Sequence, residues 1–145
     1  LAATVASAEV ADAFWSDDPQ ATLMHGPTYM ANPLGCSAAN ASLDLFETEP
    51  RLEQVGAIAS QMETELAACR GLPGVKDVRV KGAIGVVELE KALDLNALKA
   101  RFVELDVWIR PLGRTIYLTP AFTISPEELS ALTGAIHQVA CELAR

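Results

Sequence analysis

Two short stretches of alternating residues, separated by only two positions, constrain the fold of this chain more than any other feature. Residues 75–81 place the apolar residues Val78 and Val80 two positions apart, and residues 84–89 follow directly after a break at Gly82. A spacing of two is the periodicity of a β-strand, and a glycine between two such runs is typical of a turn. The sequence therefore predicts a pair of neighbouring strands in the middle of the chain.

Segments with helical periodicity lie on both sides of this pair. A helix is expected to begin at Pro50, and its apolar stripe repeats at steps of three and four residues along Leu52, Val55, Ile58, Met62, Leu66 and Cys69. A shorter helix is expected over residues 95–105. The run Ser125-Pro126-Glu127-Glu128 has the pattern of a capping box with proline at the first helical position, and it predicts a final helix that continues to about Leu143.

Two more strands are expected between the last two helices. Residues 107–112 and 115–119 are separated only by Gly113-Arg114, which is typical of a hairpin with a two-residue turn. The resulting order from Pro50 onward is α, β, β, α, β, β, α. This order indicates an α+β domain over residues 50–145, with helices packed against a mostly antiparallel sheet.

Residues 1–49 do not show the pattern of a complete domain. The apolar stretch 1–6 predicts a buried strand, and Ser7 can cap a helix that continues to about Phe14. Asn32-Pro33 is a strong helix start, and the helix that follows to about Glu47 is rich in small residues. These elements suggest the edge of a larger α/β body, so we expect the chain to be a piece of a longer protein.

The charge distribution excludes several classes of partner. The net charge is −8, and residues 1–50 carry seven acids with no lysine or arginine. Such a surface argues against binding to nucleic acid or to an anionic membrane. The chain has three widely spaced cysteines and two histidines, which favours reduced cytoplasmic thiols over a disulfide framework or a metal site.

Two places in the chain have residues suited to binding an anion. With a two-residue turn at positions 113–114, the hairpin register would place Arg110 directly across from Tyr117, and a guanidinium beside a phenol can hold a carboxylate. The alternative is an ordinary arginine–tyrosine surface pair. The run His25-Gly26-Pro27-Thr28 lies just before a helix start, where free N–H groups and the Thr28 hydroxyl could bind a phosphate. The alternative there is an ordinary turn.

Three segments of the chain resemble a known family, and together the resemblance covers essentially the whole chain. They are HGPTYMANPLGCSAANASL (25–43), DVRVKGAIGVVEL (77–89) and VWIRPLGRTIYLTPAFTISPEEL (107–129). They resemble the C-terminal part of class III, fold-type-I aminotransferases, which depend on pyridoxal 5'-phosphate (PLP). Pro27, the AIGVVE segment and the W-I-R-P run resemble the biotin-pathway members. This implies transfer of an amino group from S-adenosylmethionine to 8-amino-7-oxononanoate, giving 7,8-diaminononanoate.

The resemblance also implies roles for individual residues. Thr28 would bind the phosphate of the PLP that belongs to the neighbouring subunit of a homodimer with shared active sites, and Pro27 would shape that cofactor loop. Arg110 would hold the substrate carboxylate, with Tyr117 beside it and Gly26 at the substrate side of the loop. Residues 1–49 would be a remnant of the large PLP-binding domain with the interdomain helix, and residues 50–145 the small C-terminal α+β domain.

One element that an aminotransferase needs is not expected within these residues. The first lysine is Lys76, in a predicted strand, whereas the resemblance places the Schiff-base lysine upstream of Leu1. No catalytic residue and no metal ligand is therefore assigned in this chain, and the isolated 145 residues are expected to be inactive. Two other functions stay open: another class III transaminase with an ornithine-like or ω-amino donor, and a non-catalytic α+β ligand-binding or interaction module.

Overall fold

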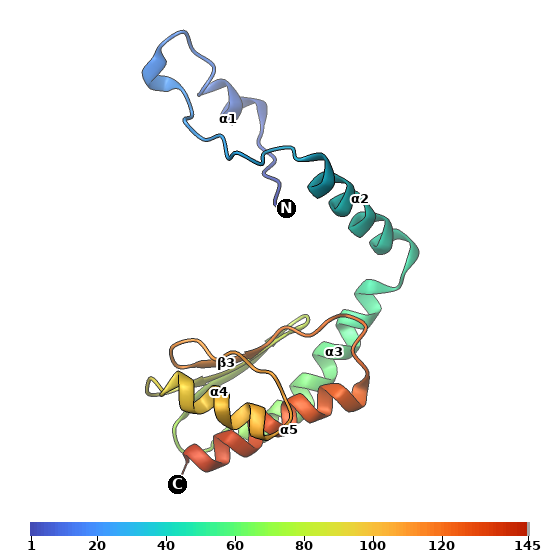
Figure 1. Ribbon diagram of the computed structural model, residues 1–145, viewed down its shortest axis with the longest axis vertical. Coiled ribbons are helices and arrows are strands. Elements are labelled where there is room, and N and C mark those ends of the chain that lie inside the picture. Colours follow the sequence, from blue (N-terminus) through green and yellow to red (C-terminus); the bar gives the residue numbers. More distant parts are fainter. Residues whose placement is uncertain (145) are drawn as a thin grey trace. The chain divides into compact units, whose positions relative to one another are not determined.

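The chain forms two structural units. The computed structural model describes residues 1–144, and the chain divides into Leu1–Glu49 and Pro50–Arg145. In chain order the elements are α1 (Ala8–Asp12), the 3-10 turn η1 (Pro19–Ala21), α2 (Pro33–Thr48), α3 (Arg51–Leu66), η2 (Ala67–Cys69), β1 (Val75–Lys81), β2 (Ile84–Leu89), α4 (Leu95–Glu104), β3 (Thr115–Leu118) and α5 (Pro126–Leu143) (Figure 1). None of the helices described in residues 1–144 is long and apolar enough to cross a membrane.

The second unit is built on a three-stranded antiparallel sheet with the order β1-β2-β3. One row of cross-strand partners, Val78, Val87 and Ile116, is buried and faces the helices. Because side chains alternate between the two faces of a strand, the neighbouring rows point away from the core. The strands predicted over 75–81 and 84–89 are confirmed, and so is the α+β fold class with its antiparallel sheet.

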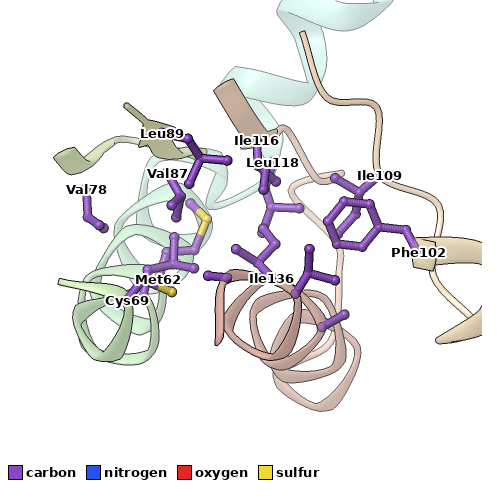
Figure 2. Packing of buried hydrophobic residues seen from close by; sticks show 14 of the residues in the cluster. Met62, Cys69, Val78, Val87, Leu89, Phe102, Ile109, Ile116, Leu118 and Ile136 are labelled. Carbon is purple, nitrogen blue, oxygen red and sulfur yellow. The ribbon is translucent and has the colours of Figure 1, made fainter. Parts of the chain in front are cut away.

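Helices α3 and α5 pack side by side against one face of the sheet (Figure 1). The apolar stripe predicted on α3 supplies the buried residues Ile58, Met62 and Leu66, whereas Leu52 at its start is 78% exposed. Phe102 on α4 is fully buried and closes the core beside Ile109, as Figure 2 shows. The core therefore belongs entirely to the second unit.

A polar cluster fixes α3 to α5 at the edge of this core. The Glu65 carboxylate accepts hydrogen bonds from Ser130 Oγ at 2.7 Å, from Gln61 Nε2 at 3.0 Å and from the Thr133 hydroxyl. Burial raises the pKa of Glu65, but these three bonds outweigh it, so the pKa lies below its ordinary value. The predicted capping box of α5 is also confirmed, since Ser125 and Glu128 exchange both hydrogen bonds.

The first unit has helices but no core. Ser7 caps α1 and Asn32 caps α2 as predicted, the latter by accepting a 3.0 Å bond from Gly35 N–H. The predicted buried strand over residues 1–6 is wrong, because this segment is exposed and has no regular structure. The apolar pattern of residues 1–6 gives no information about their surroundings. No residue in 1–49 is buried, so a strand there would have no core to pack against. Helix α1 also ends at Asp12 rather than near Phe14.

The strand predicted over residues 107–112 is also wrong. The two-residue turn at Gly113-Arg114 is present, and Leu112 and Thr115 exchange two backbone hydrogen bonds of 2.8 Å, but the ladder stops at this single bridge. Proline fixes φ near −65°, far from the value of about −140° in an antiparallel strand, so Pro111 turns the chain away from β3.

Candidate functional site

The loop that contains Gly26, Pro27 and Thr28 consists of two consecutive turns that lead into α2. Met30 N–H donates to the Pro27 carbonyl at 2.9 Å, and Asn32 N–H donates to the Tyr29 carbonyl at 3.2 Å. All three predicted site residues are exposed. The two turns overlap at Tyr29 and Met30, so the loop is a folded structure that presents Thr28 to its surroundings.

Ala31 has an unusual backbone conformation in the second of these turns. Its φ is 52°, in the left-handed region that residues with a Cβ atom rarely adopt. Ala31 occupies the third position of the turn, where a type II turn needs a positive φ and glycine or asparagine is usual. No sequence pattern marks this residue, because alanine gives no signal for such a conformation.

The hydrogen-bond donors of the loop suit an anion. Within residues 1–144, no backbone or side-chain acceptor is found for the N–H groups of Thr28 and Tyr29, and Thr28 also carries a hydroxyl. The donors of this loop are neutral N–H and O–H groups, and residues 1–50 contain no lysine or arginine that could add a positive charge. Clustered backbone N–H groups with a hydroxyl are a typical donor set for a phosphate oxygen.

Arg110 projects from a segment that is fixed on both sides. Ile109 is 3% exposed and Pro111 is buried, whereas Arg110 itself is exposed. Among the residues that the structure describes, no carboxylate lies within ion-pair distance of its guanidinium, in contrast to Arg79, Arg101 and Arg114. An anchored arginine without an acidic partner is suited to binding an external carboxylate bidentately.

Tyr117 lies on the outer face of the sheet rather than in a ladder with Arg110. Its cross-strand partner is Val86 of β2, so the predicted cross-strand pair of Arg110 and Tyr117 is not formed. The core row next to it contains Ile116, which places the half-buried Tyr117 side chain opposite the core. Arg110 and Tyr117 therefore lie on either side of the Gly113-Arg114 turn, but they are not cross-strand partners.

The same outer face contains a cluster of charges around Glu88. Its carboxylate is 2.9 Å from Lys76 Nζ, 2.9 Å from Arg79 Nη1 and 3.0 Å from Arg114 Nη2. The hydrogen bonds from Lys76 and Arg79 hold the pKa of Glu88 at about 2, well below its ordinary value of 4.5. Lys76 is thus engaged in an ion pair on the sheet surface.

Replacing Glu88 by glutamine should make the second unit less stable at pH 7, because three cations would then share an uncharged partner. The depressed pKa means that the stabilisation from Glu88 is present above about pH 4.5 and is lost as the pH falls toward 2. We expect the urea midpoints of Glu88→Gln and the parent chain to converge over this interval. Glu90→Gln, at an exposed position two residues along, is the matched control. A gap between parent and Glu88→Gln that is unchanged from pH 6 to pH 3 would contradict the prediction.

Comparison with known proteins identifies the family. The family model described as aminotransferase class-III matches residues 1–140. The chain belongs to the class III aminotransferases. It is 39% identical, over 94% of its length, to the adenosylmethionine-8-amino-7-oxononanoate aminotransferase of Corynebacterium glutamicum, and it covers 32% of that protein. The chain thus spans about a third of the length of this curated relative.

Solved structures support the same fold. The adenosylmethionine-8-amino-7-oxononanoate aminotransferase of Methanocaldococcus jannaschii is 30% identical, with a TM-score of 0.71, over 85% of this chain and 30% of that one. An (S)-enantioselective omega-transaminase from Thermomicrobium roseum is 25% identical, with a TM-score of 0.76, over 95% of this chain and 33% of that one. The expected resemblance to fold-type-I transaminases is confirmed.

Proposed function

We propose that these residues are the C-terminal third of a PLP-dependent aminotransferase that converts 8-amino-7-oxononanoate to 7,8-diaminononanoate with S-adenosylmethionine as amino donor. The observation that carries the proposal is the 39% identity, over 94% of the chain, to a relative named for this reaction. In this proposal residues 50–145 are the small domain, and residues 1–49 belong to the large domain and the interdomain helix.

The residues of the loop fit the phosphate end of PLP. The Thr28 hydroxyl would donate to a phosphate oxygen, and the adjacent N–H groups of Thr28 and Tyr29 would donate to the same group. When bound, PLP supplies the electron sink that makes amino-group transfer possible. The lysine that carries the cofactor is proposed to lie in the part of the large domain that these residues do not cover. Residues 1–50, which include the proposed large-domain part of this chain, contain no lysine.

The substrate end of the site is assigned to the second unit. Arg110 would bind a substrate carboxylate through two parallel N–H···O bonds, which fix the orientation of the substrate as well as its position. Tyr117 would lie beside it. Gly26 of the first unit would also face the substrate, and the space next to it is open, since an added Cβ there would meet no atom of the described residues within 4 Å.

A homodimer with shared active sites fits the exposed apolar surface of the first unit. Its large exposed hydrophobic side chains include Val5, Trp15, Met24, Tyr29 and Leu34, which are 78–96% exposed. Large apolar side chains that are left this exposed are suited to being covered by another polypeptide. We propose that the rest of the large domain and the partner subunit cover them, and that Thr28 serves the partner's cofactor.

The choice of amino donor distinguishes the proposal from its rivals. The intact, PLP-loaded enzyme should lose the visible absorbance of its cofactor when S-adenosylmethionine is added without an acceptor, because the amino group then stays on the enzyme. Loss with ornithine or an ω-amino donor but not with S-adenosylmethionine would favour another class III transaminase. A protein that responds to no amine would favour a non-catalytic module.

A further inference from the structure

We propose that Ala31 is a positioning residue for the phosphate site at Thr28. Its left-handed backbone closes the second turn of the loop and thereby fixes the direction of the Thr28 hydroxyl and the adjacent N–H donors. The residue at position 31 then sets the affinity for the phosphate group of the cofactor without touching it. This inference rests on the proposed function.

The overlap of the two turns links position 31 to Thr28. The Pro27–Met30 turn and the Tyr29–Asn32 turn share two residues, so the backbone at Ala31 determines whether the second turn can close next to the first. The far end of the loop is held as well, since the Asn32 side chain accepts a bond from Gly35 N–H at the start of α2. The φ of 52° at Ala31 is the one strained backbone angle between these two anchored points.

The conformation at position 31 should therefore control how much of the loop is ready to bind. In this proposal closure of the second turn holds Tyr29 and Met30, which are also the last two residues of the first turn. The Thr28 and Tyr29 donors are then ordered together, and the apparent dissociation constant rises as the closed fraction of the second turn falls. Glycine adopts positive φ readily and asparagine tolerates it, whereas a β-branched residue such as valine resists it strongly. Alanine lies between these extremes.

Substitutions at position 31 test the proposal in the intact enzyme. The variants Ala31→Gly, Ala31→Asn and Ala31→Val are stripped of cofactor and titrated with PLP, with cofactor absorbance and competition by inorganic phosphate as the readouts. The expected order of affinity is glycine and asparagine above alanine, and alanine above valine. The expected gap between asparagine and valine is at least tenfold, which corresponds to about 1.4 kcal/mol. Since asparagine and valine are similar in size, equal affinities of these two variants would overturn the proposal.

Two further variants separate this inference from the proposed function. Ala38→Gly, at an exposed position within α2, controls for added chain flexibility and should leave the affinity for PLP unchanged. Thr28→Val removes the hydroxyl donor and should weaken PLP binding. If Thr28→Val binds PLP normally, the phosphate site itself is refuted. If Thr28→Val weakens binding while the three variants at position 31 bind alike, the site stands and the positioning role of Ala31 is refuted. Circular dichroism confirms that each variant is folded.

Discussion

Replacing Phe102 by alanine should destabilise the second unit by about 3–5 kcal/mol, the usual loss when a buried phenylalanine is truncated. Phe102 is the largest of the fully buried side chains, and it joins α4 to the core that the sheet, α3 and α5 enclose. Domains of this size are stable by only about 5–15 kcal/mol, so the loss would remove much of the total. In a thermal melt the midpoint should fall by more than about 10 °C.

A neighbouring residue on the same helix provides the control for this prediction. Val103 is 52% exposed, so Val103→Ala should change the free energy of unfolding by no more than about 0.5 kcal/mol. Phe102→Leu keeps most of the apolar volume and should fall between the two. An unfolding free energy for Phe102→Ala within 1 kcal/mol of the parent would show that α4 is not part of the core.

The sequence predicted those elements whose signals are local. The strands at 75–81 and 84–89 and the capped start of α5 each follow from alternation or from a capping box, and the structure has them at the expected positions. These signals suffice because the second unit buries its own apolar faces. Local pattern and tertiary packing therefore favour the same structure there.

The errors arise where local pattern and packing disagree. The apolar stretch 1–6 has the composition of a buried strand, but the first unit offers it nothing to pack against. Residues 107–112 alternate between buried and exposed side chains as a strand would, since Ile109 is buried and both Trp108 and Arg110 are exposed. The ladder nevertheless ends at Pro111.

Of the candidate site, the sequence could indicate residue types but not their geometry. The Gly113-Arg114 turn was predictable from its length, whereas the separation of Arg110 from the β3 ladder depends on Pro111 and on tertiary contacts. The left-handed conformation of Ala31 was not predictable, because the residue that signals such a turn is glycine.

Substituting Arg110 by alanine in the intact enzyme should raise the KM for carboxylate-bearing substrates at least tenfold without releasing the cofactor. Hydrogen bonds to a charged group contribute about 1.5–3 kcal/mol each, and a factor of ten corresponds to about 1.4 kcal/mol. The flanking core residues Ile109 and Pro111 should keep the backbone in place when the side chain is removed. Steady-state kinetics with both substrates, together with the cofactor content of the purified variant, measure the effect.

Another arginine in the same turn region makes this experiment selective. Arg114 is half exposed and already paired with Glu88, so Arg114→Ala removes the same side chain but should leave KM for both substrates unchanged. Arg110→Lys keeps the charge but loses the planar pair of donors, and it should recover only part of the lost affinity. If KM for both substrates is unchanged in Arg110→Ala, the guanidinium is an ordinary surface group and the carboxylate must bind elsewhere. If Arg110→Ala and Arg114→Ala raise KM equally, the effect is the general loss of positive charge on this face rather than a specific site.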